Sequence, residues 1–276
     1  MSTLKESLQT ARDILKGNGI ADADVDAWYL LAHVMGINRA EYLLHREEAI
    51  PADTAVRFRE LVQLRAKHIP LQHLTGSQEF MGLDFAVNEN VLIPRQDTEI
   101  LVEEVIKVCE GKSVLDLCTG SGCIIISLAK LSRITEAVAV DISEKALEVA
   151  ADNAQRHGVR IELIKSDLYE KVSGSYDIIV SNPPYIRTEE VAALMPEVRD
   201  HEPYIALEAG SDGLMFYRRI IEGLSAHLKK DGKVFFEIGY DQAEAVKALL
   251  ISQGFTQVAV MKDLSGLDRV ISAQRP

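Results

Sequence analysis

The chain has 276 residues, of which 47% are hydrophobic and 26% are charged, and these values are typical of a globular protein with room for two domains. No apolar run approaches the ~18 residues that a membrane-spanning helix needs, so no membrane partner is expected. Cys109, Cys118 and Cys123 form neither an even set nor a Cys-x-x-Cys pair, which predicts a reduced, cytoplasmic setting. The net charge of −12 disfavours nucleic acid as a partner, because phosphate binding relies on basic surface.

Residues 1–72 have the spacing of short helices. Asn38 and Glu41 have the spacing of a capping box, in which two side chains satisfy backbone N–H groups at a helix start. A later helix around Phe58 is expected to end before Pro70. Short helices of this kind predict a small bundle with one shared core. Its apolar side chains repeat at helical spacing in Leu4, Leu8, Ala11 and Leu15, and again in Val25, Trp28, Ala32 and Met35.

The pattern changes in residues 73–96. Two short runs, Gln78–Phe80 and Leu83–Val87, flank Met81-Gly82, which indicates a β-hairpin. We therefore expect a hairpin connector between two domains, one formed by residues 1–72 and the other by residues 97–276.

From residue 97 onward, strand-like and helix-like segments alternate. Helical segments such as 144–156 and 214–228 lie between most of the strands. This alternation predicts an α/β fold with a doubly wound, mostly parallel sheet, whose ligand site lies beyond the carboxyl ends of the strands. Residues 269–271 follow the last expected strand closely and are expected to pair with it antiparallel. The expected strands are 114–117, 137–140, 161–164, 176–180, 233–238 and 256–260.

A loop containing two glycines follows the first of these strands. Val114–Leu117 leads directly into Cys118-Thr119-Gly120-Ser121-Gly122, and a helical segment begins at Cys123. Glycine opens backbone angles closed to other residues and lets a ligand approach the main chain. Asp141 ends the next strand, 21 positions after Gly120, close to the ~20 expected of a carboxylate that binds ribose hydroxyls. The combination predicts a nucleoside site, although a structural turn with a helix-capping Asp141 has the same spacing.

The type of nucleoside follows from what the loop lacks. Position 125 is Ile, so the full Gly-x-Gly-x-x-Gly of a dinucleotide site is missing, and no Gly-Lys-Ser/Thr phosphate loop is present. A nucleoside without phosphates fits better, and S-adenosylmethionine is the common one. Asp167 and Leu168, after the third strand, are expected to face its adenine, with the carboxylate accepting from the amino group, although an ordinary loop at the end of a strand has the same spacing. The seven histidines show no metal-ligand spacing, so no metal is expected.

The segment Asn182-Pro183-Pro184-Tyr185 directly follows the strand of residues 176–180 and Ser181. Its two prolines fix their own backbone angles and hold Asn182 extended, so the segment is rigid. Planar amides and aromatic amines attack a methyl sulfonium poorly, because the nitrogen lone pair is delocalised. The Asn182 side-chain oxygen and the Pro183 carbonyl are each expected to accept one N–H bond, aiming the nitrogen and stabilising its growing positive charge. Tyr185 is expected to stack on the target, and no general base is required.

These motifs resemble those of a known family. Asn182–Tyr185 after a Rossmann-type cofactor loop is similar to the amino-methyltransferases, and longer stretches resemble the protein release factor glutamine methyltransferases. With the helical front, the resemblance covers nearly the whole chain. The stretches are Gln78–Leu83, Leu92–Glu99, Val114–Gly122, Val180–Ile186, Glu202-Pro203, Asp212–Arg218, Glu237–Gln242 and Asp263–Val270.

The resemblance implies a Rossmann-like class I methyltransferase sheet with an antiparallel last strand, preceded by a helical bundle that helps to hold a substrate protein. It implies methylation of the glutamine side chain in the Gly-Gly-Gln motif of peptide chain release factors, which modulates translation termination. The substrate site maps onto Asn182, Pro183, Pro184 and Tyr185, with Phe80 and Arg95 either at its mouth or in packing roles. The cofactor site maps onto Cys118, Thr119, Gly120, Ser121, Gly122, Asp141, Ile142, Asp167, Leu168 and Asn182.

Cys118 stands where the family often has glycine, so the first turn of the loop is expected to differ slightly. We interpret this cysteine as a tolerated small residue rather than a nucleophile.

Two other functions stay open. A nucleic-acid methyltransferase acting on adenine or guanine amines would share both motifs, but the acidic charge disfavours it. A non-catalytic binding module would share the fold, but it would not need both Asp141 and Asn182. A monomer is expected.

Overall fold

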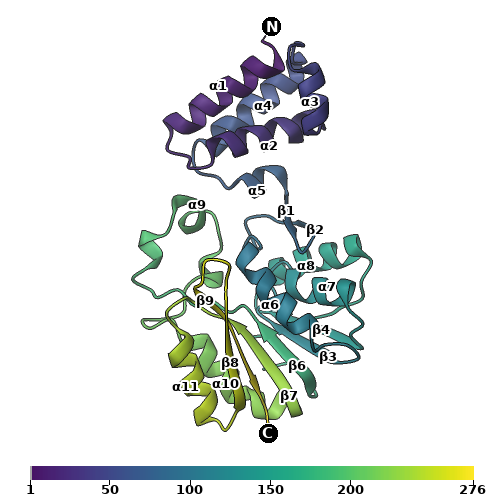
Figure 1. Cartoon of the computed structure of the whole chain (residues 1–276), viewed down its shortest axis with the longest axis vertical. Helices are drawn as coiled ribbons and strands as arrows, with labels where there is room; N and C mark the ends of the chain where they lie inside the picture. Colours follow the sequence, from purple (N-terminus) through teal and green to yellow (C-terminus); the bar gives the residue numbers. More distant parts are fainter. Residues whose placement is uncertain (1) are drawn as a thin grey trace. The chain divides into compact units, whose positions relative to one another are not determined.

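The computed structural model of the chain describes residues 2–276 and divides into two compact units (Figure 1). The first unit comprises the residues up to Ser77 together with Met195–His201. The second comprises Gln78–Leu194 and Glu202–Pro276, so the boundary falls inside the segment expected as a connector. Within residues 2–276, no helix combines the length and the apolar character that crossing a membrane requires.

The first unit is a bundle of short helices. Leu4, Leu8, Ala11 and Leu15 form the buried face of its first helix, as their spacing predicts. Asn38 starts the third helix in the predicted capping box, where its Oδ1 accepts a hydrogen bond from the backbone nitrogen of Glu41 at 3.1 Å. The helices are α1 (Leu4–Gly17), α2 (Ala23–Met35), α3 (Arg39–His45), α4 (Ala52–Arg65), α5 (Leu71–Thr75) and, from later in the chain, α9 (Pro196–Arg199).

The buried face of α2 differs from the predicted one. Val25 is exposed, whereas Leu30 and Leu31 are fully buried. The Trp28 ring is buried as expected and meets the Tyr42 ring edge-on, with 5.4 Å between ring centroids. Because α2 packs against both α1 and α4, its buried surface is wider than the single stripe that the spacing indicates.

A partly buried cluster of charged side chains joins Met195–His201 to the rest of the first unit. Arg65 Nε lies 2.7 Å from Asp26 Oδ2, and both side chains are nearly inaccessible to solvent. Arg65 Nη2 lies 3.0 Å from Glu197 Oε1, and His68 Nδ1 lies 2.9 Å from the same oxygen. Arg65 and Glu197 are 132 positions apart in the chain. Desolvated charges need partners, and Glu197 supplies one to Arg65, which explains why its segment folds with α2 and α4.

The second unit is an α/β domain built on a seven-stranded sheet with the order β5-β4-β3-β6-β7-β9-β8. Except for Ser77, a two-stranded hairpin of β1 (Ser77–Phe80) and β2 (Leu83–Ala86) also belongs to this unit, and it turns at Met81-Gly82 as predicted. The strands of the sheet are β3 (Ser113–Leu117), β4 (Glu136–Asp141), β5 (Glu162–Lys165), β6 (Tyr176–Ser181), β7 (Leu228–Glu237), β8 (Thr256–Lys262) and β9 (Asp268–Gln274). The helices are α6 (Gln96–Ile106), α7 (Cys123–Leu131), α8 (Glu144–His157), α10 (Met215–His227) and α11 (Ala243–Ser252), with short 3₁₀ turns η1 (Val191–Ala193) and η2 (Tyr204–Ala206).

Strand direction in the sheet is mostly parallel. The pairs β3–β4, β4–β5, β3–β6 and β6–β7 all run parallel. The last strand, β9, lies between β7 and β8 and is antiparallel to both. The predicted mostly parallel sheet with an antiparallel last strand is therefore confirmed.

Helices cover both faces of this sheet (Figure 1). Successive side chains of a strand point to opposite faces, so neighbouring residues enter different cores. Leu115 and Phe236 pack with α10 and α11, whereas Val114 and Phe235 pack with α6 and α7. Because both faces are covered, the central strands β3, β4 and β6 are mostly buried, and the loops at the carboxyl ends of the strands are the open surface on which a ligand can bind.

Candidate active site

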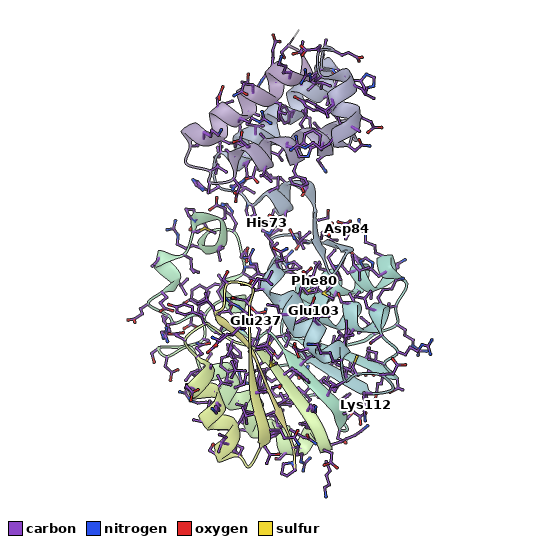
Figure 2. All side chains as sticks on the ribbon, viewed as in Figure 1. His73, Phe80, Asp84, Glu103, Lys112 and Glu237 are labelled. Carbon is purple, nitrogen blue, oxygen red and sulfur yellow. The ribbon has the colours of Figure 1, made fainter. Side chains whose placement is uncertain are left out.

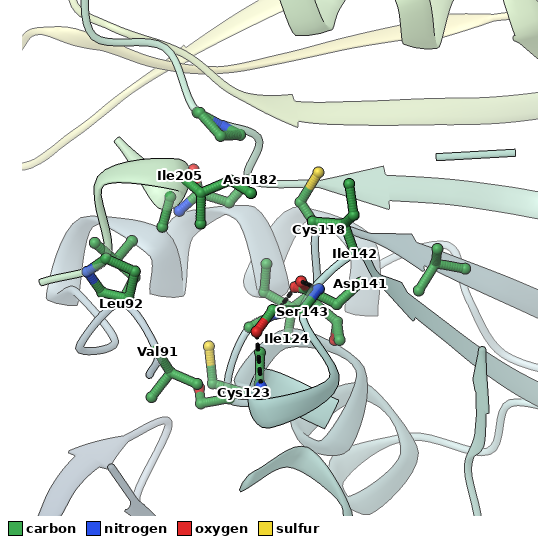
Figure 3. A pocket seen from close by; sticks show the side chains of 18 of the residues that line it. Val91, Leu92, Cys118, Cys123, Ile124, Asp141, Ile142, Ser143, Asn182 and Ile205 are labelled. Atoms are coloured by element: carbon green, nitrogen blue, oxygen red, sulfur yellow. Dashed lines mark hydrogen bonds between the residues drawn. The ribbon is translucent and has the colours of Figure 1, made fainter. Parts of the chain in front are cut away.

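The carboxyl ends of four parallel strands surround one pocket in the second unit (Figure 3). Cys118 follows β3, Asp141 ends β4, Asp167 follows β5 and Asn182 follows β6, and all four line the pocket. The pocket encloses about 1070 Å³, its open mouth included. Of the residues predicted for the site, the lining contains Arg95, Cys118, Thr119, Gly120, Ser121, Asp141, Ile142, Asp167, Leu168, Asn182 and Pro184.

Asp141 holds the glycine loop in place. Its Oδ2 accepts a hydrogen bond from the backbone nitrogen of Gly120, and its Oδ1 accepts one from Ser143, each at 2.9 Å. A Cβ on Gly120 would meet nothing within 4 Å, so its main chain is open to a ligand. Gly122 does not line the pocket; a Cβ there would lie 2.8 Å from Ile126 Cδ1. Gly120 therefore lets a ligand approach the main chain, whereas Gly122 allows the loop to pack closely against α7.

Cys118 adopts a backbone conformation that glycine favours. Its φ of 61° lies in the left-handed region, which costs a residue with a side chain roughly 1–2 kcal/mol. The loop therefore makes the turn that glycine would make, at the expense of local strain. Burial and the neighbouring Asp141 and Asp116 raise the pKa of the Cys118 thiol, which keeps the thiol protonated. A protonated thiol is a poor nucleophile, in agreement with the interpretation of Cys118 as a tolerated small residue.

Asp116 is completely buried beneath the loop. Its Oδ2 accepts a hydrogen bond from Thr119 Oγ1 at 2.6 Å, while its Oδ1 has no hydrogen-bond partner. Burial raises the pKa of Asp116 from 3.8 to about 7, against the lowering effect of the Thr119 hydroxyl. With a pKa of about 7, the Asp116 carboxyl is expected to exchange a proton near neutral pH.

Replacing Asp116 by asparagine is expected to make stability less dependent on pH. A folded-state pKa above the unfolded value means that the folded state binds more protons, so the free energy of unfolding falls as pH rises from about 4 to about 7. With the pKa of Asp116 at about 7, the wild type is expected to lose roughly 3 kcal/mol between about pH 5 and about pH 8. Asp116→Asn removes this loss, and urea unfolding of both proteins at the two pH values measures it. If both proteins lose the same free energy of unfolding between the two pH values, Asp116 is not the group responsible for the pH dependence.

The end of β5 carries an ion pair at the pocket wall. Asp167 Oδ2 lies 2.8 Å from Nη2 of Arg219, a residue of α10. Leu168 is buried and takes a positive φ of 48°. Phe216 of α10 lines the pocket together with these three residues. The predicted adenine end of the pocket is thus built from a loop and a helix that is far from it in the chain.

The Asn182–Tyr185 segment contributes to the pocket unevenly. Asn182 and Pro184 line it, whereas Pro183 and Tyr185 are not among its lining residues. Asn182 Nδ2 donates a hydrogen bond to Thr98 Oγ1 at 3.3 Å. The Tyr185 ring packs against the core, and its hydroxyl donates to Glu237 Oε1 at 3.2 Å. Tyr185 is half-buried, so part of its ring is used in packing, and its stacking on a target stays a prediction.

Phe80 and Arg95 were each predicted to lie at the mouth of the site or in packing. Phe80, labelled in Figure 2, is 1% exposed and is not among the lining residues. Its ring meets the Phe85 ring edge-on, with 6.0 Å between centroids. The structure therefore places Phe80 in the core. Arg95 lines the pocket, and its Nη2 lies 2.5 Å and 2.7 Å from the two carboxylate oxygens of Glu202.

Several residues at or behind the pocket were absent from the predicted site, among them Thr98, Phe216, Arg219 and Glu237. Glu237 could have been predicted from its position in the sequence. A carboxylate that ends an apolar strand has the same placement as Asp141 at the end of β4. Thr98 and Phe216 lie in stretches that resemble the family, but nothing in those stretches marks them as site residues, and Arg219 lies outside them. Their places at the pocket therefore became visible through the fold.

The charges around the pocket suit a nucleoside without phosphates. Its two basic lining residues are both engaged, Arg95 with Glu202 and Arg219 with Asp167, so neither is free to bind a phosphate. An ionised carboxylate offers about four lone-pair sites, and Asp141 uses two of them on backbone amides. Sites remain on Asp141 for ligand hydroxyls. Within residues 2–276, no group of three or more His, Cys, Asp or Glu side chains is arranged to hold a metal ion.

Protein-family models match both parts of the chain. The model described as PrmC N-terminal domain matches residues 6–76, and the one described as Methyltransferase small domain matches residues 95–197. The release factor glutamine methyltransferase of Agrobacterium fabrum is 40% identical over 283 residues, covering 99% of this chain and 98% of the relative. Proteins of the same name from Geobacter sulfurreducens and Cereibacter sphaeroides are 39% and 42% identical, covering 99% and 98% of this chain and 96% and 98% of theirs.

Solved structures share the fold. A methyltransferase from Pyrococcus furiosus aligns with a TM-score of 0.56 at 18% identity, over 82% of this chain and 99% of that one. The 16S rRNA N2 G1207 methyltransferase of Thermus thermophilus, solved in complex with AdoMet and guanosine, aligns with a TM-score of 0.52 at 18% identity, over 72% of this chain and 50% of that one. At these identities the likeness concerns the fold, and the predicted class I methyltransferase sheet is confirmed.

Proposed function

The chain belongs to the family of release factor glutamine methyltransferases, and on that premise we propose that it methylates the side-chain amide nitrogen of the glutamine in the Gly-Gly-Gln motif of peptide chain release factors. This modification modulates translation termination. The observation that carries the proposal is about 40% identity, over nearly the whole chain, to relatives of that name. The full coverage includes the helical first unit, which we propose helps to hold the factor.

S-adenosylmethionine is the methyl donor in this proposal, and when bound it supplies an electrophilic methyl group on a sulfonium. The charges of the pocket support this choice, since the two lining arginines are already paired and Asp141 retains acceptor sites. Asp141 would bind the ribose hydroxyls, and the open main chain at Gly120 would let the ligand approach the loop. Asp167 and Leu168 would lie along the adenine.

The reaction places one demand on the protein, which is to aim a weak nucleophile. The lone pair of an amide nitrogen is delocalised, so its approach must be held in line with the bond that breaks. Asn182 Oδ1 and the Pro183 carbonyl would each accept one of the two N–H bonds of the glutamine amide. These acceptors become more favourable as positive charge grows on the nitrogen. The methylated nitrogen is then acidic enough to lose its proton without a dedicated base.

The test is direct. The purified protein is mixed with S-adenosylmethionine and a recombinant release factor, and tryptic peptides are weighed by mass spectrometry. The expected result is one added methyl group on the Gly-Gly-Gln peptide, and none when the target glutamine is replaced by asparagine. Methyl transfer to RNA or DNA, with none to the factor, would assign the activity to nucleic acid and overturn the proposal. Binding of S-adenosylmethionine without methyl transfer to the release factor, RNA or DNA would show that the chain is a non-catalytic binding module.

A further inference from the structure

A buried carboxylate lies behind Asn182. Glu237 ends β7 and is 2% exposed (Figure 2). Its Oε2 accepts a hydrogen bond from Thr98 Oγ1 at 2.5 Å, and its Oε1 accepts one from the Tyr185 hydroxyl at 3.2 Å. Thr98, on α6, is as deeply buried and also contacts Asn182 Nδ2 at 3.3 Å. A continuous chain of hydrogen bonds thus connects the pocket residue Asn182 to Glu237.

The chain of hydrogen bonds has a direction. A threonine hydroxyl has one hydrogen to donate, and an ionised carboxylate accepts only. Since Thr98 gives its hydrogen to Glu237, its oxygen can only accept from Asn182. Asn182 must then turn its NH₂ group towards Thr98, which leaves its Oδ1 on the other side of the amide. The Tyr185 hydroxyl donates into the second oxygen of Glu237, so both oxygens act as acceptors.

The surroundings of Glu237 act on its pKa in both directions and on balance raise it. Burial raises the pKa of the Glu237 carboxyl, while the Thr98 hydroxyl, the Arg269 guanidinium and the Tyr185 hydroxyl lower it and Asp97 raises it. Arg269 is itself held by Asp263 and Asp97, at 3.2 Å and 3.3 Å. Two hydroxyl donors and a nearby cation therefore surround the carboxylate, and these are the interaction partners that stabilise a buried charge.

We infer that Thr98 and Glu237 are positioning residues, which orient the Asn182 amide so that its oxygen faces the target nitrogen. The inference rests on the proposed function, because the target is the amide NH₂ group of a glutamine. With the opposite amide orientation, Asn182 would present its own NH₂ group to that of the target, and two donors cannot bond to each other. The acceptor that stabilises the growing positive charge would then be lost.

The first test compares two substitutions at one position. Thr98→Val keeps the shape of the side chain and removes the hydroxyl, whereas Thr98→Ser keeps the hydroxyl. We expect Thr98→Val to lower kcat for release factor methylation about 10- to 100-fold and to leave the affinity for S-adenosylmethionine within about twofold of wild type. Thr98→Ser is expected to retain kcat within about threefold. Glu237→Gln, whose amide can donate as well as accept, is expected to lower kcat with unchanged cofactor affinity.

A purely structural role for the two residues predicts another pattern. In that case Thr98→Val and Thr98→Ser would lose activity in proportion to their loss in melting temperature, and cofactor affinity would fall with it. That pattern, or wild-type kcat in Thr98→Val, overturns the inference.

A second measurement does not depend on turnover. The side-chain NH₂ resonances of Asn182 can be assigned in ¹⁵N-labelled protein by their disappearance in Asn182→Ala. Thr98→Val is expected to shift these resonances, whereas Thr98→Ser leaves them close to the wild type. If the wild type fails to methylate the release factor, the proposed function falls, but these resonances still decide the positioning role. Unchanged Asn182 resonances in Thr98→Val would refute that role even in an active enzyme.

Discussion

Replacing Asn182 by alanine is expected to lower kcat for methyl transfer about 10²- to 10³-fold, the loss typical of removing one aligned electrostatic partner of a transition state. The side chain lines the pocket directly after β6, and Thr98 holds its amide. Without its oxygen, the target nitrogen loses both its alignment and the acceptor for its growing positive charge. The affinity for S-adenosylmethionine is expected to fall far less than kcat, because Asn182 is only one of the predicted cofactor contacts and Asp141 and the glycine loop are unchanged.

The measurement separates these two effects. Single-turnover methylation of a release factor gives the chemical step, and calorimetric titration gives the cofactor affinity. Asn18→Ala is the matched control, because Asn18 is exposed and uses its side chain on the carbonyl of Ile14. It should methylate at the wild-type rate. An Asn182→Ala enzyme with undiminished kcat would remove Asn182 from the mechanism.

Replacing Asp141 by alanine is expected to weaken S-adenosylmethionine binding about 100-fold or more. The carboxylate has two tasks in the proposal, fixing the loop through Gly120 and Ser143 and accepting from the ribose hydroxyls. Hydrogen bonds to a charged group contribute about 1.5–3 kcal/mol each, and about 1.4 kcal/mol corresponds to a tenfold change in affinity. Losing two such bonds to the ligand therefore accounts for a factor of this size.

Glu144→Ala is the control for Asp141→Ala. Glu144 lies three positions further along, is exposed, and pairs with Lys165 at 2.6 Å, so its removal deletes a carboxylate without touching the pocket. Titration calorimetry should show the wild-type dissociation constant for Glu144→Ala and a strongly raised one for Asp141→Ala. Release factor methylation by Asp141→Ala should recover in part at high cofactor concentration. A dissociation constant within about threefold of wild type would show that Asp141 is a structural residue.

The local pattern of the sequence determined the elements and the edge of the sheet where the site lies. Alternating strand and helix segments require a mostly parallel sheet, and the carboxyl ends of parallel strands meet at one edge. Asp141, Asp167 and Asn182 could therefore be assigned to one pocket before their distances were known. The capping box of Asn38 and Glu41 was equally predictable, because both partners lie within one helical turn.

The tertiary structure alone decided which side chains stand behind the pocket. Thr98 lies 84 positions from Asn182 and 139 from Glu237, yet the three form one hydrogen-bonded chain. Such contacts depend on the order of the strands and on where α6 packs, and no local periodicity encodes either. The same reason explains why the contact of the Tyr185 hydroxyl with Glu237 could not be predicted from the sequence.

Long-range contacts also set the limits of the two units. Glu197 lies between two segments of the α/β domain in the chain, yet it pairs with Arg65 of the helical bundle. Tertiary packing also decides the place of Phe80, whose ring packs on Phe85 and does not line the pocket. Sequence spacing determines which face of an element is apolar, because that depends on neighbours within a few positions. The partner of a loop residue depends on the fold of the whole chain. A buried polar group needs a hydrogen-bond partner, and only the tertiary structure determines which group lies near enough to be one.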